Sequence, residues 1–518
     1  MLLPKKLENP VKVLLVQPAP FEPGRLGLEN VLWMSEPVAL TQLAGTLLPE
    51  HEVKILDMRL EPEMVLNETL LDFKPDLVGS TSMTTDCYQA KAILQVAKQT
   101  LGDTCFTIVG GHHPTLAPQD FENEVVDCMC LGEGEETFLE LIKHLDAGGD
   151  PRQLSHIDGL RYRDADGNYH TTSKRSQMRE LDTLPLPARH LLPERYRKEY
   201  FFAVANPMAS METSRGCSFD CNFCAIWEFY DRKTRYMSAE AICDRLEKIP
   251  EDYVFFLDDN FLSDKKRLEA LCDEIERRGI KKYYGTQGRT DFMVANPKLM
   301  KRLSDIGFMM ILSGYESNSD NNLDALRKRN TADNNRKAIE MLKKLGIVST
   351  GIFMARQDFS EEDFDNVYEI INDMGVAIPL VVIHTPLPGT QLWREREHEL
   401  LTRDSRFFDL LHSVLPTKLP RKTFYKKFVA QNDATWPALR KGLTAAMRRK
   451  PKFFIKSIPG TVRFLKRIQQ YRPIASDYES HLRDEIGIIP QDIRIDSESV
   501  VQAKERKKRL NVIQGATG

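Results

Sequence analysis

Three of the nine cysteines fall within eight residues, at Cys217, Cys221 and Cys224 in the stretch RGCSFDCNFCAIWEF. Such close thiols are poorly placed for three separate disulfides, and thiolates on a tight loop are ligands for soft metal centres. Three thiolates can hold three irons of a [4Fe-4S] cluster and leave the fourth iron open for a substrate or cofactor. A zinc site that borrows a distant fourth ligand is the alternative.

The elements around these cysteines predict a partial parallel barrel over residues 206–395. Apolar strands alternate with amphipathic helices six times, and the cysteines directly follow the first strand. Because barrel chemistry belongs at the carboxyl ends of the strands, the cysteine loop lies at the expected mouth. The expected strands are 209–213, 253–257, 283–287, 309–312, 348–354 and 380–384, with helices at 239–249, 265–278, 297–306, 336–345 and 361–374.

Polar residues follow several of these strands. Taken singly, an acid at a strand end is more often a cap or an ion-pair partner. Their common place at one mouth makes them candidate ligands for a cofactor beside the cysteines. They are Asp258, Asp259 and Asn260, then Arg289 and Asp291, then Ser313 and Glu316.

Residues 1–148 predict a separate α/β unit, a doubly wound parallel sheet. Expected strands at 11–18, 53–57, 76–82, 105–111 and 126–135 alternate with helices at 39–48, 88–99 and 136–145. Ligands of such sheets lie beyond the carboxyl ends of the strands, where small residues let a large ligand approach the backbone. The candidates there are Ser80, Ser82, Gly110, Gly111, His112, Gly132, Glu133, Gly134 and Glu135.

Residues 149–205 predict a proline-rich linker with one hairpin, and residues 396–518 predict a mostly helical basic domain. Between Arg421 and Gln470 there are 14 Lys plus Arg against one acid. The segment Met447–Tyr471 mixes cations with Phe and Ile, as peripheral membrane anchors do. A solvated helical face packed on its own domain is the alternative.

Composition narrows the class of protein. No apolar run approaches the roughly 18 residues of a membrane span, and no secretory signal is present at the start. We therefore expect a cytoplasmic protein, with contact at the inner membrane face left open. The net charge of -3 and the lack of an RNA-binding motif lead us to expect no nucleic-acid partner.

The cysteine spacing, with Phe223 before the last cysteine, resembles the signature of radical S-adenosylmethionine (SAM) enzymes. The resemblance implies that Cys217, Cys221 and Cys224 bind a [4Fe-4S] cluster on which SAM docks. It places Asp258 and Asp259 at the SAM amino group. It places Arg289, Ser313 and Glu316 where later strand ends contact the ribose and carboxylate.

The N-terminal unit is similar to the cobalamin-binding, Rossmann-like domain of one branch of these enzymes. The matching stretches are STS at 80–82, GGHHP at 110–114 and GEGE at 132–135. They imply a cobalamin cradle. The D-x-H-x-x-G motif of many cobalamin proteins is absent, because Arg59 takes the place of its histidine. This excludes a lower-axial histidine at that position. His112 and His113 are expected to act through their backbone or indirectly, through residues that contact the cofactor.

Within this branch the chain resembles methyltransferases of class B, and most specifically the hopanoid C-3 methylases. HTPLPGTQLW (residues 384–393) and the stretch from Glu399 to Tyr425 carry that likeness. It implies methylation of an unactivated carbon of a polycyclic lipid: one SAM yields a 5′-deoxyadenosyl radical, a second methylates cobalamin, and an external donor supplies one electron. The alternatives are a radical cyclase resembling the anaerobic protoporphyrin ester cyclases and a non-enzymatic sensor with a structural cluster.

Overall fold

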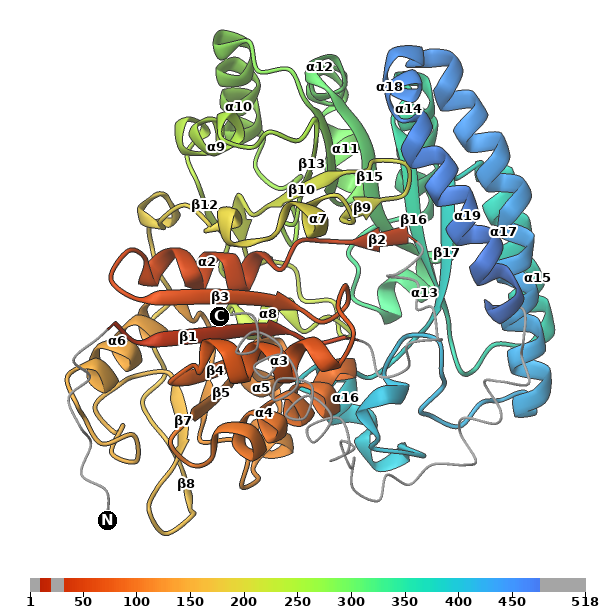
Figure 1. Cartoon of the computed structure of the whole chain (residues 1–518). Helices are drawn as coiled ribbons and strands as arrows, with labels where there is room; N and C mark the ends of the chain where they lie inside the picture. Colours follow the sequence, from red (N-terminus) through yellow and green to blue (C-terminus); the bar gives the residue numbers. More distant parts are fainter. Residues whose placement is uncertain (1–9, 20–31, 476–518) are drawn as a thin grey trace, which may run out of the picture.

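The structure, a computed structural model, describes residues 10–19 and 32–475. Its first sheet has the strand order β3-β1-β4-β5-β6-β7-β8. The strands β3, β1, β4, β5 and β6 run parallel. The predicted doubly wound sheet is thus confirmed (Figure 1). The strands are β1 (Lys12–Gln17), β3 (Glu52–Asp57), β4 (Leu77–Thr81), β5 (Phe106–Gly110), β6 (Cys128–Cys130), β7 (Leu160–Arg163) and β8 (Tyr169–Thr171).

Helices cover both faces of this sheet. In β1, Val13 and Leu15 pack under α2 (Val38–Leu47) and α6 (Glu135–Asp146). Leu14 and Val16 face the opposite way, under α3 (Met64–Phe73) and α4 (Cys87–Leu101). Since successive side chains of a strand point to opposite faces, a fully apolar strand is the pattern that a sheet buried on both sides requires.

The hairpin expected in the linker belongs to the first sheet instead. β7 pairs antiparallel with β6, and β8 pairs with β7. The predicted boundary at residue 148 therefore divides one sheet. Two short antiparallel strands do not bury enough apolar surface alone, so the hairpin extends an existing edge.

The second sheet has the order β10-β13-β14-β15-β16-β17, and all its pairs are parallel. Among the described residues β10 and β17 do not pair with each other, so the predicted partial six-stranded barrel is confirmed as an open one. The strands are β10 (Met208–Met211), β13 (Tyr253–Phe256), β14 (Tyr283–Gln287), β15 (Phe308–Glu316), β16 (Val348–Ala355) and β17 (Ile378–Ile383).

Amphipathic helices line the outside of this sheet. Leu268, Leu271 and Ile275 of α10 and Leu299 and Leu303 of α12 are buried in one cluster with the strands. Their i, i+3, i+7 spacing is the pattern of a helix with one buried face. The helices are α9 (Ala239–Glu247), α10 (Lys265–Arg278), α11 (Thr290–Ala295), α12 (Pro297–Ile306), α14 (Ala332–Leu345) and α15 (Glu361–Met374).

The C-terminal part is helical, as predicted. It consists of α16 (Gln391–Arg396), α17 (Arg421–Arg449), α18 (Pro451–Lys456) and α19 (Ile458–Ala475). Phe424 and Phe428 of α17 are buried against α15 and β17. Figure 1 shows α17 and α19 side by side on the outer flank of the second sheet. The end of the predicted domain, residues 476–518, lies outside the described residues.

Candidate functional site

The cysteine loop is held at the mouth of the open barrel by a short hairpin. β11 (Ser214–Arg215) pairs antiparallel with β12 (Arg235–Tyr236), and the three cysteines lie between these strands. Gly216 turns the chain into the loop with φ +89°, and a Cβ there would overlap the carbonyl oxygen of Lys233. Only glycine combines this backbone conformation with this close approach.

The loop offers three free thiols with the chemistry of a cluster site. Cys221 is buried, while Cys217 and Cys224 are partly exposed. The Cys224 amide donates to the Cys221 carbonyl at 3.1 Å, and Trp227 Nε1 donates to the same oxygen at 2.9 Å. Within the described residues no three His, Cys, Asp or Glu side chains are grouped to hold a single metal ion. A [4Fe-4S] cluster makes a different demand, because each thiolate binds a different iron, and the donor set fits it.

Asp258 holds the residues that precede the cysteine loop. Its carboxylate is fully buried and accepts the Thr213 amide at 2.6 Å and the hydroxyls of Thr213 and Ser214 at 2.5 and 2.6 Å. Arg267 adds an ion pair at 3.3 Å. The chain's own donors thus reach both oxygens, and the contact of Asp258 with the amino group of SAM stays a prediction.

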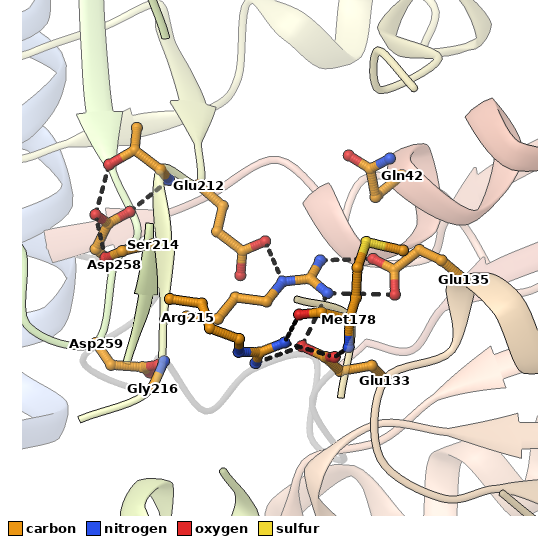
Figure 2. Close-up of polar contacts among 12 residues, drawn as sticks. Gln42, Glu133, Glu135, Met178, Glu212, Ser214, Arg215, Gly216, Asp258 and Asp259 are labelled. Atoms are coloured by element: carbon orange, nitrogen blue, oxygen red, sulfur yellow. Dashed lines mark hydrogen bonds and ion pairs between the residues drawn. The ribbon is translucent and has the colours of Figure 1, made fainter. Parts of the chain in front are cut away.

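Asp259 keeps one oxygen available. Its Oδ2 accepts the Gly216 amide at 2.8 Å, directly before Cys217 (Figure 2). Burial raises the pKa of this carboxyl to about 7, since a buried charge loses its hydration. No protein donor to Oδ1 occurs among the described contacts, so of the two predicted aspartates Asp259 is the one with an atom left for a ligand.

Arg289 also holds the cysteine loop. Its guanidinium lies 3.6 Å from the ring centroid of Phe219, which stands between Cys217 and Cys221. It pairs with Asp291 at 3.0 Å and donates to the carbonyl of Lys328 at 2.7 Å. A stacked and hydrogen-bonded arginine is well suited to fix loop geometry.

Glu316 is aimed by an irregular strand end. The register of β15 against β16 shifts between Gly314 and Glu316, and Glu316 has φ +58°. Such bulges re-aim a side chain beside functional sites. Its Oε1 accepts Lys328 Nζ at 2.8 Å, whereas its Oε2 is buried without a hydrogen-bond partner. Ser313, by contrast, donates its hydroxyl to the Gly288 carbonyl at 2.8 Å.

Sequence reasoning gave no role to two further residues at this mouth. His384 follows β17, and its ring lies 6.1 Å from that of Phe223, in the cysteine motif. Gln357 donates to the His384 carbonyl at 2.6 Å. His384 Nε2 and Gln357 Oε1 are buried and unpartnered. Both residues line a cavity of about 390 Å³ beside Asn222. The strand-end position of His384 in HTPLPGT was the available signal.

The unpartnered side-chain atoms of Glu316, His384 and Gln357 are ones with which the polar groups of SAM can pair. Buried polar atoms are normally hydrogen-bonded, so unpaired ones beside a cavity indicate a missing polar partner. SAM presents an ammonium, hydroxyls and an adenine to such atoms. Burial, followed by the charge of Arg356, lowers the pKa of His384 to about 4, so its ring is neutral at pH 7.

The ligand edge of the first sheet combines a glycine at positive φ with a glycine that faces open space. Gly111 has φ +111°, and a Cβ there would stand 2.8 Å from the Ser82 carbonyl oxygen. At Gly132 a Cβ would meet nothing within 4 Å, so open space lies in front of it. His112 begins α5 (His112–Leu116), and its Nε2 is buried and unpartnered. Open space and an unpartnered ring nitrogen at a strand end are features that a cofactor such as cobalamin can use.

Other predicted residues of this edge make hydrogen bonds or close packing contacts within the protein. The Ser80 and Ser82 hydroxyls donate to the neighbouring carbonyls of Thr81 and Met83 at 3.1 and 2.8 Å. Cβ atoms at Gly110 and Gly134 would contact Cys130, and at Gly134 also Leu43 at 3.2 Å. These serines and glycines shape the edge through the backbone.

Arg59, which replaces the motif histidine, is fixed by an ion pair. It donates to Asp57 at 2.8 Å through Nε, and Asp57 is fully buried. Asp57 also accepts the Tyr200 hydroxyl at 3.0 Å. The Arg59 guanidinium is therefore held by a carboxylate of the same domain.

Glu133 and Glu135, expected at the cofactor, instead bind arginines of the cysteine hairpin (Figure 2). Arg215 reaches Glu135 at 2.5 Å, Glu212 at 2.8 Å and Glu133 at 3.1 Å. Arg235 pairs with Glu133 at 2.7 Å. The physical reason is charge: buried carboxylates at a strand end need cations, and the facing hairpin supplies them. This cluster, the Arg215 network, joins the two sheets.

A second contact brings the two edges together. α5 packs against α8 (Ile226–Phe229), the short helix that follows the cysteine loop. The ring of His112 lies 4.7 Å from that of Phe229. The ligand edge of the first sheet and the cysteine loop of the second therefore face one another.

Comparisons with known proteins agree with this arrangement. Residues 25–142 match the B12 binding domain, and residues 211–371 match the Radical SAM superfamily. The hopanoid C-3 methylase of Methylococcus capsulatus is 32% identical over 429 residues, which are 81% of this chain and 79% of that protein. The anaerobic magnesium-protoporphyrin IX monomethyl ester cyclase of Rubrivivax gelatinosus is 27% identical over 68% of this chain and 64% of its own length.

A solved structure has the same fold. The cobalamin-dependent S-adenosylmethionine radical enzyme OxsB, with aqua-cobalamin and S-adenosylmethionine bound, aligns with a TM-score of 0.65. The alignment covers 98% of this chain and 81% of that one, at 17% identity. At this identity the likeness concerns the fold.

Proposed function

The chain belongs to the cobalamin-dependent radical SAM enzymes, with cobalamin, SAM and a [4Fe-4S] cluster as cofactors, and from this premise we propose that it methylates an unactivated carbon of a polycyclic lipid such as a hopanoid. When bound, these cofactors supply the radical chemistry and the methyl group. The protein's part is to place them, to place the substrate carbon and to exclude water.

One observation carries the proposal: the two cofactor edges face each other across a contact made by the chain itself. The His112 ring meets Phe229 at 4.7 Å, and Arg215 joins Glu133 and Glu135 to the cysteine hairpin. A carbon that reacts at the cluster side and takes a methyl group from the cobalamin side has to reach both. Residues held in rigid contact can fix that spacing, on which the rate of such a transfer depends.

The roles of the cluster side follow from its contacts. We assign Cys217, Cys221 and Cys224 to the cluster, with Arg289 and Asp259 holding the loop through Phe219 and Gly216. For SAM, the unpartnered atoms favour Glu316, His384 and Gln357. Phe223 supports the same side through its contact with the His384 ring.

On the cobalamin side, Gly111, Gly132 and His112 are the residues with space or an unpaired atom in front of them. Ser80, Ser82, Gly110 and Gly134 shape that edge. Glu133 and Glu135 act indirectly, because their ion pairs with Arg215 and Arg235 hold the β11–β12 hairpin in place. No side chain at the Arg59 position serves as a cobalt ligand.

The lipid class is supported by the relative that is 32% identical over most of both chains and is named for a hopanoid. A cyclase is the second candidate, because a relative of that name matches 68% of this chain. The two differ in their products. A methyl gain separates them from ring closure.

The test is an anaerobic assay of the reconstituted enzyme with SAM, a chemical reductant and a membrane lipid extract, read by mass spectrometry. Methylation predicts 5′-deoxyadenosine, S-adenosylhomocysteine and a lipid heavier by about 14 mass units, the CH2 increment. Cys221→Ala is the matched control and should give none of these. 5′-Deoxyadenosine without S-adenosylhomocysteine or a methylated lipid would favour the cyclase. Neither product from fully loaded enzyme would remove the support for a lipid.

A further inference from the structure

The last two described helices carry a stripe of exposed apolar side chains. Ile458, Val462 and Leu465 of α19 are 57%, 49% and 53% exposed, and Ile455 at the end of α18 is 66% exposed. Positions i, i+4 and i+7 share one face of a helix, so the α19 residues form a continuous strip. Isolated exposed apolar residues are common on proteins, whereas a contiguous row indicates a surface for a partner.

The direction of this strip is fixed by the opposite side of α19. Phe464 is buried, and at Gly460 the helix approaches so closely that a Cβ would overlap the Val204 carbonyl oxygen. The Arg467 guanidinium lies 3.3 Å from the centroid of the Phe201 ring. These anchors determine the rotation of the helix about its axis. The contacts on that side leave Ile458, Val462 and Leu465 exposed on the other side of the helix.

Cations accompany the strip. Lys452, Lys456 and Lys466 are exposed, and only Lys456 has an ion pair among the described contacts, to Asp252 at 2.6 Å. The sequence contains no Asp or Glu between Asp433 and Asp477. Apolar side chains flanked by lysines, in a segment that itself contains no acid, match an anionic lipid surface, where the apolar groups enter the headgroup boundary and the lysines meet phosphates.

We propose that α18 and α19 form a docking surface for an anionic lipid bilayer, with Ile455, Ile458, Val462 and Leu465 inserted and Lys452 and Lys466 at the headgroups. No helix in the described part of the chain is long and apolar enough to cross a bilayer, so the contact is peripheral. A second copy of the chain fits less well, because a two-fold contact would set lysines against lysines. The inference rests on the proposed lipid substrate for its purpose, while the surface itself rests on exposure and charge.

The experiment measures binding of the full chain, loaded with cluster and cobalamin, to vesicles by co-sedimentation. One set of vesicles is phosphatidylcholine alone and the other an equimolar mixture with phosphatidylglycerol. We expect binding to the anionic set only. The triple variant Ile458→Gln, Val462→Gln, Leu465→Gln should lower the partition coefficient by about tenfold or more. Lys452→Gln with Lys466→Gln should lower it by roughly fivefold per cation, and added salt should do the same to the wild type.

Matched controls replace exposed apolar residues and lysines that lie outside α18 and α19. Met64→Gln with Leu401→Gln removes exposed apolar side chains from other elements, and Lys281→Gln with Lys298→Gln removes exposed lysines. Both should bind vesicles like the wild type. Bound cobalamin absorbance and thermal unfolding of every variant report that it is folded.

Three results would overturn the inference: no binding to anionic vesicles, equal binding to both sets, or binding that the triple variant retains. Sedimentation velocity without lipid tests the second copy, and a dimer that only the triple variant loses would assign the strip to self-association. Vesicle binding needs no turnover. Loss of methylation with intact binding would therefore count against the proposed function and not against this surface.

Discussion

The Arg215 network makes a quantitative prediction about how the two sheets are held together. The Arg215 side chain is only 6% exposed, and its guanidinium contacts Glu133, Glu135 and Glu212. In Arg215→Met, Glu133 keeps Arg235, but Glu135 and Glu212 lose the only cation within ion-pair distance among the described contacts. Removing one partner of a buried ion pair costs about 3–5 kcal/mol, because a charge is left in a medium that hydrates it poorly.

The loss should depend on pH. Burial already raises the pKa of Glu212 with Arg215 present, and without that cation the pKa of Glu212 should rise further. The folded variant then binds more protons than the unfolded chain, so its unfolding free energy falls as pH rises above about 4.3, the ordinary value of Glu. Urea unfolding at pH 6 and pH 8 measures this: the deficit of Arg215→Met should be larger at pH 8.

Two comparisons isolate the cause. Arg277→Met removes an exposed arginine that pairs with Glu274, and it should leave the unfolding free energy near that of the wild type. Arg215→Met with Glu135→Gln and Glu212→Gln should recover most of the loss, since no buried charge is then unpaired. The reasoning fails if Arg215→Met costs no more than Arg277→Met, or if the triple variant is no better than the single one.

Three other perturbations test the site. Alanine at Cys217, Cys221 or Cys224 should abolish the visible absorbance of the reconstituted cluster while cobalamin binding persists. The controls Cys243→Ala and Cys272→Ala alter buried helix residues and should keep both cofactors. Cluster retention in a loop variant would contradict the assignment. His384→Gln should flatten the dependence of the unfolding free energy on pH between pH 6.5 and pH 4. Because the pKa of His384 in the folded protein is about 4, the wild type loses up to about 3 kcal/mol of unfolding free energy as pH falls through this window. An unchanged slope in urea unfolding would show that the buried ring does not cause the pH dependence. Gly111→Ala should weaken cobalamin binding at least about tenfold in an absorbance titration, through a Cβ 2.8 Å from the Ser82 carbonyl and strain of about 1–3 kcal/mol, whereas Gly102→Ala, also at positive φ but in open space, should bind normally.

Much of this architecture could be read from periodicity. The predicted helices 265–278, 297–306 and 361–374 coincide with α10, α12 and α15, because each is a single amphipathic pattern that ends at a glycine. A capping side chain begins α10 and α15, and a proline begins α12. The three cysteines were equally legible, since their spacing along one loop is itself the signal. Such features depend on neighbours in sequence.

Which strand-end residues serve a ligand depended on neighbours in space. Asp258 and Asp259 are adjacent in sequence, yet only the fold directs Asp258 to Thr213 and Ser214 and leaves an oxygen of Asp259 without a donor among the described contacts. Glu133 likewise looked like a ligand-edge acid until the hairpin brought Arg215 and Arg235 to it from more than eighty residues away.

The sequence alone thus determined the elements, their alternation and the cysteine donor set, because local spacing encodes them. The tertiary structure decided the hairpin's place in the first sheet, the partners of each buried charge, the orphaned atoms of His384 and Gln357, and the outward face of α19. The physical reason is that a buried polar group must find its partner wherever the fold provides one, and that partner carries no mark in the local sequence.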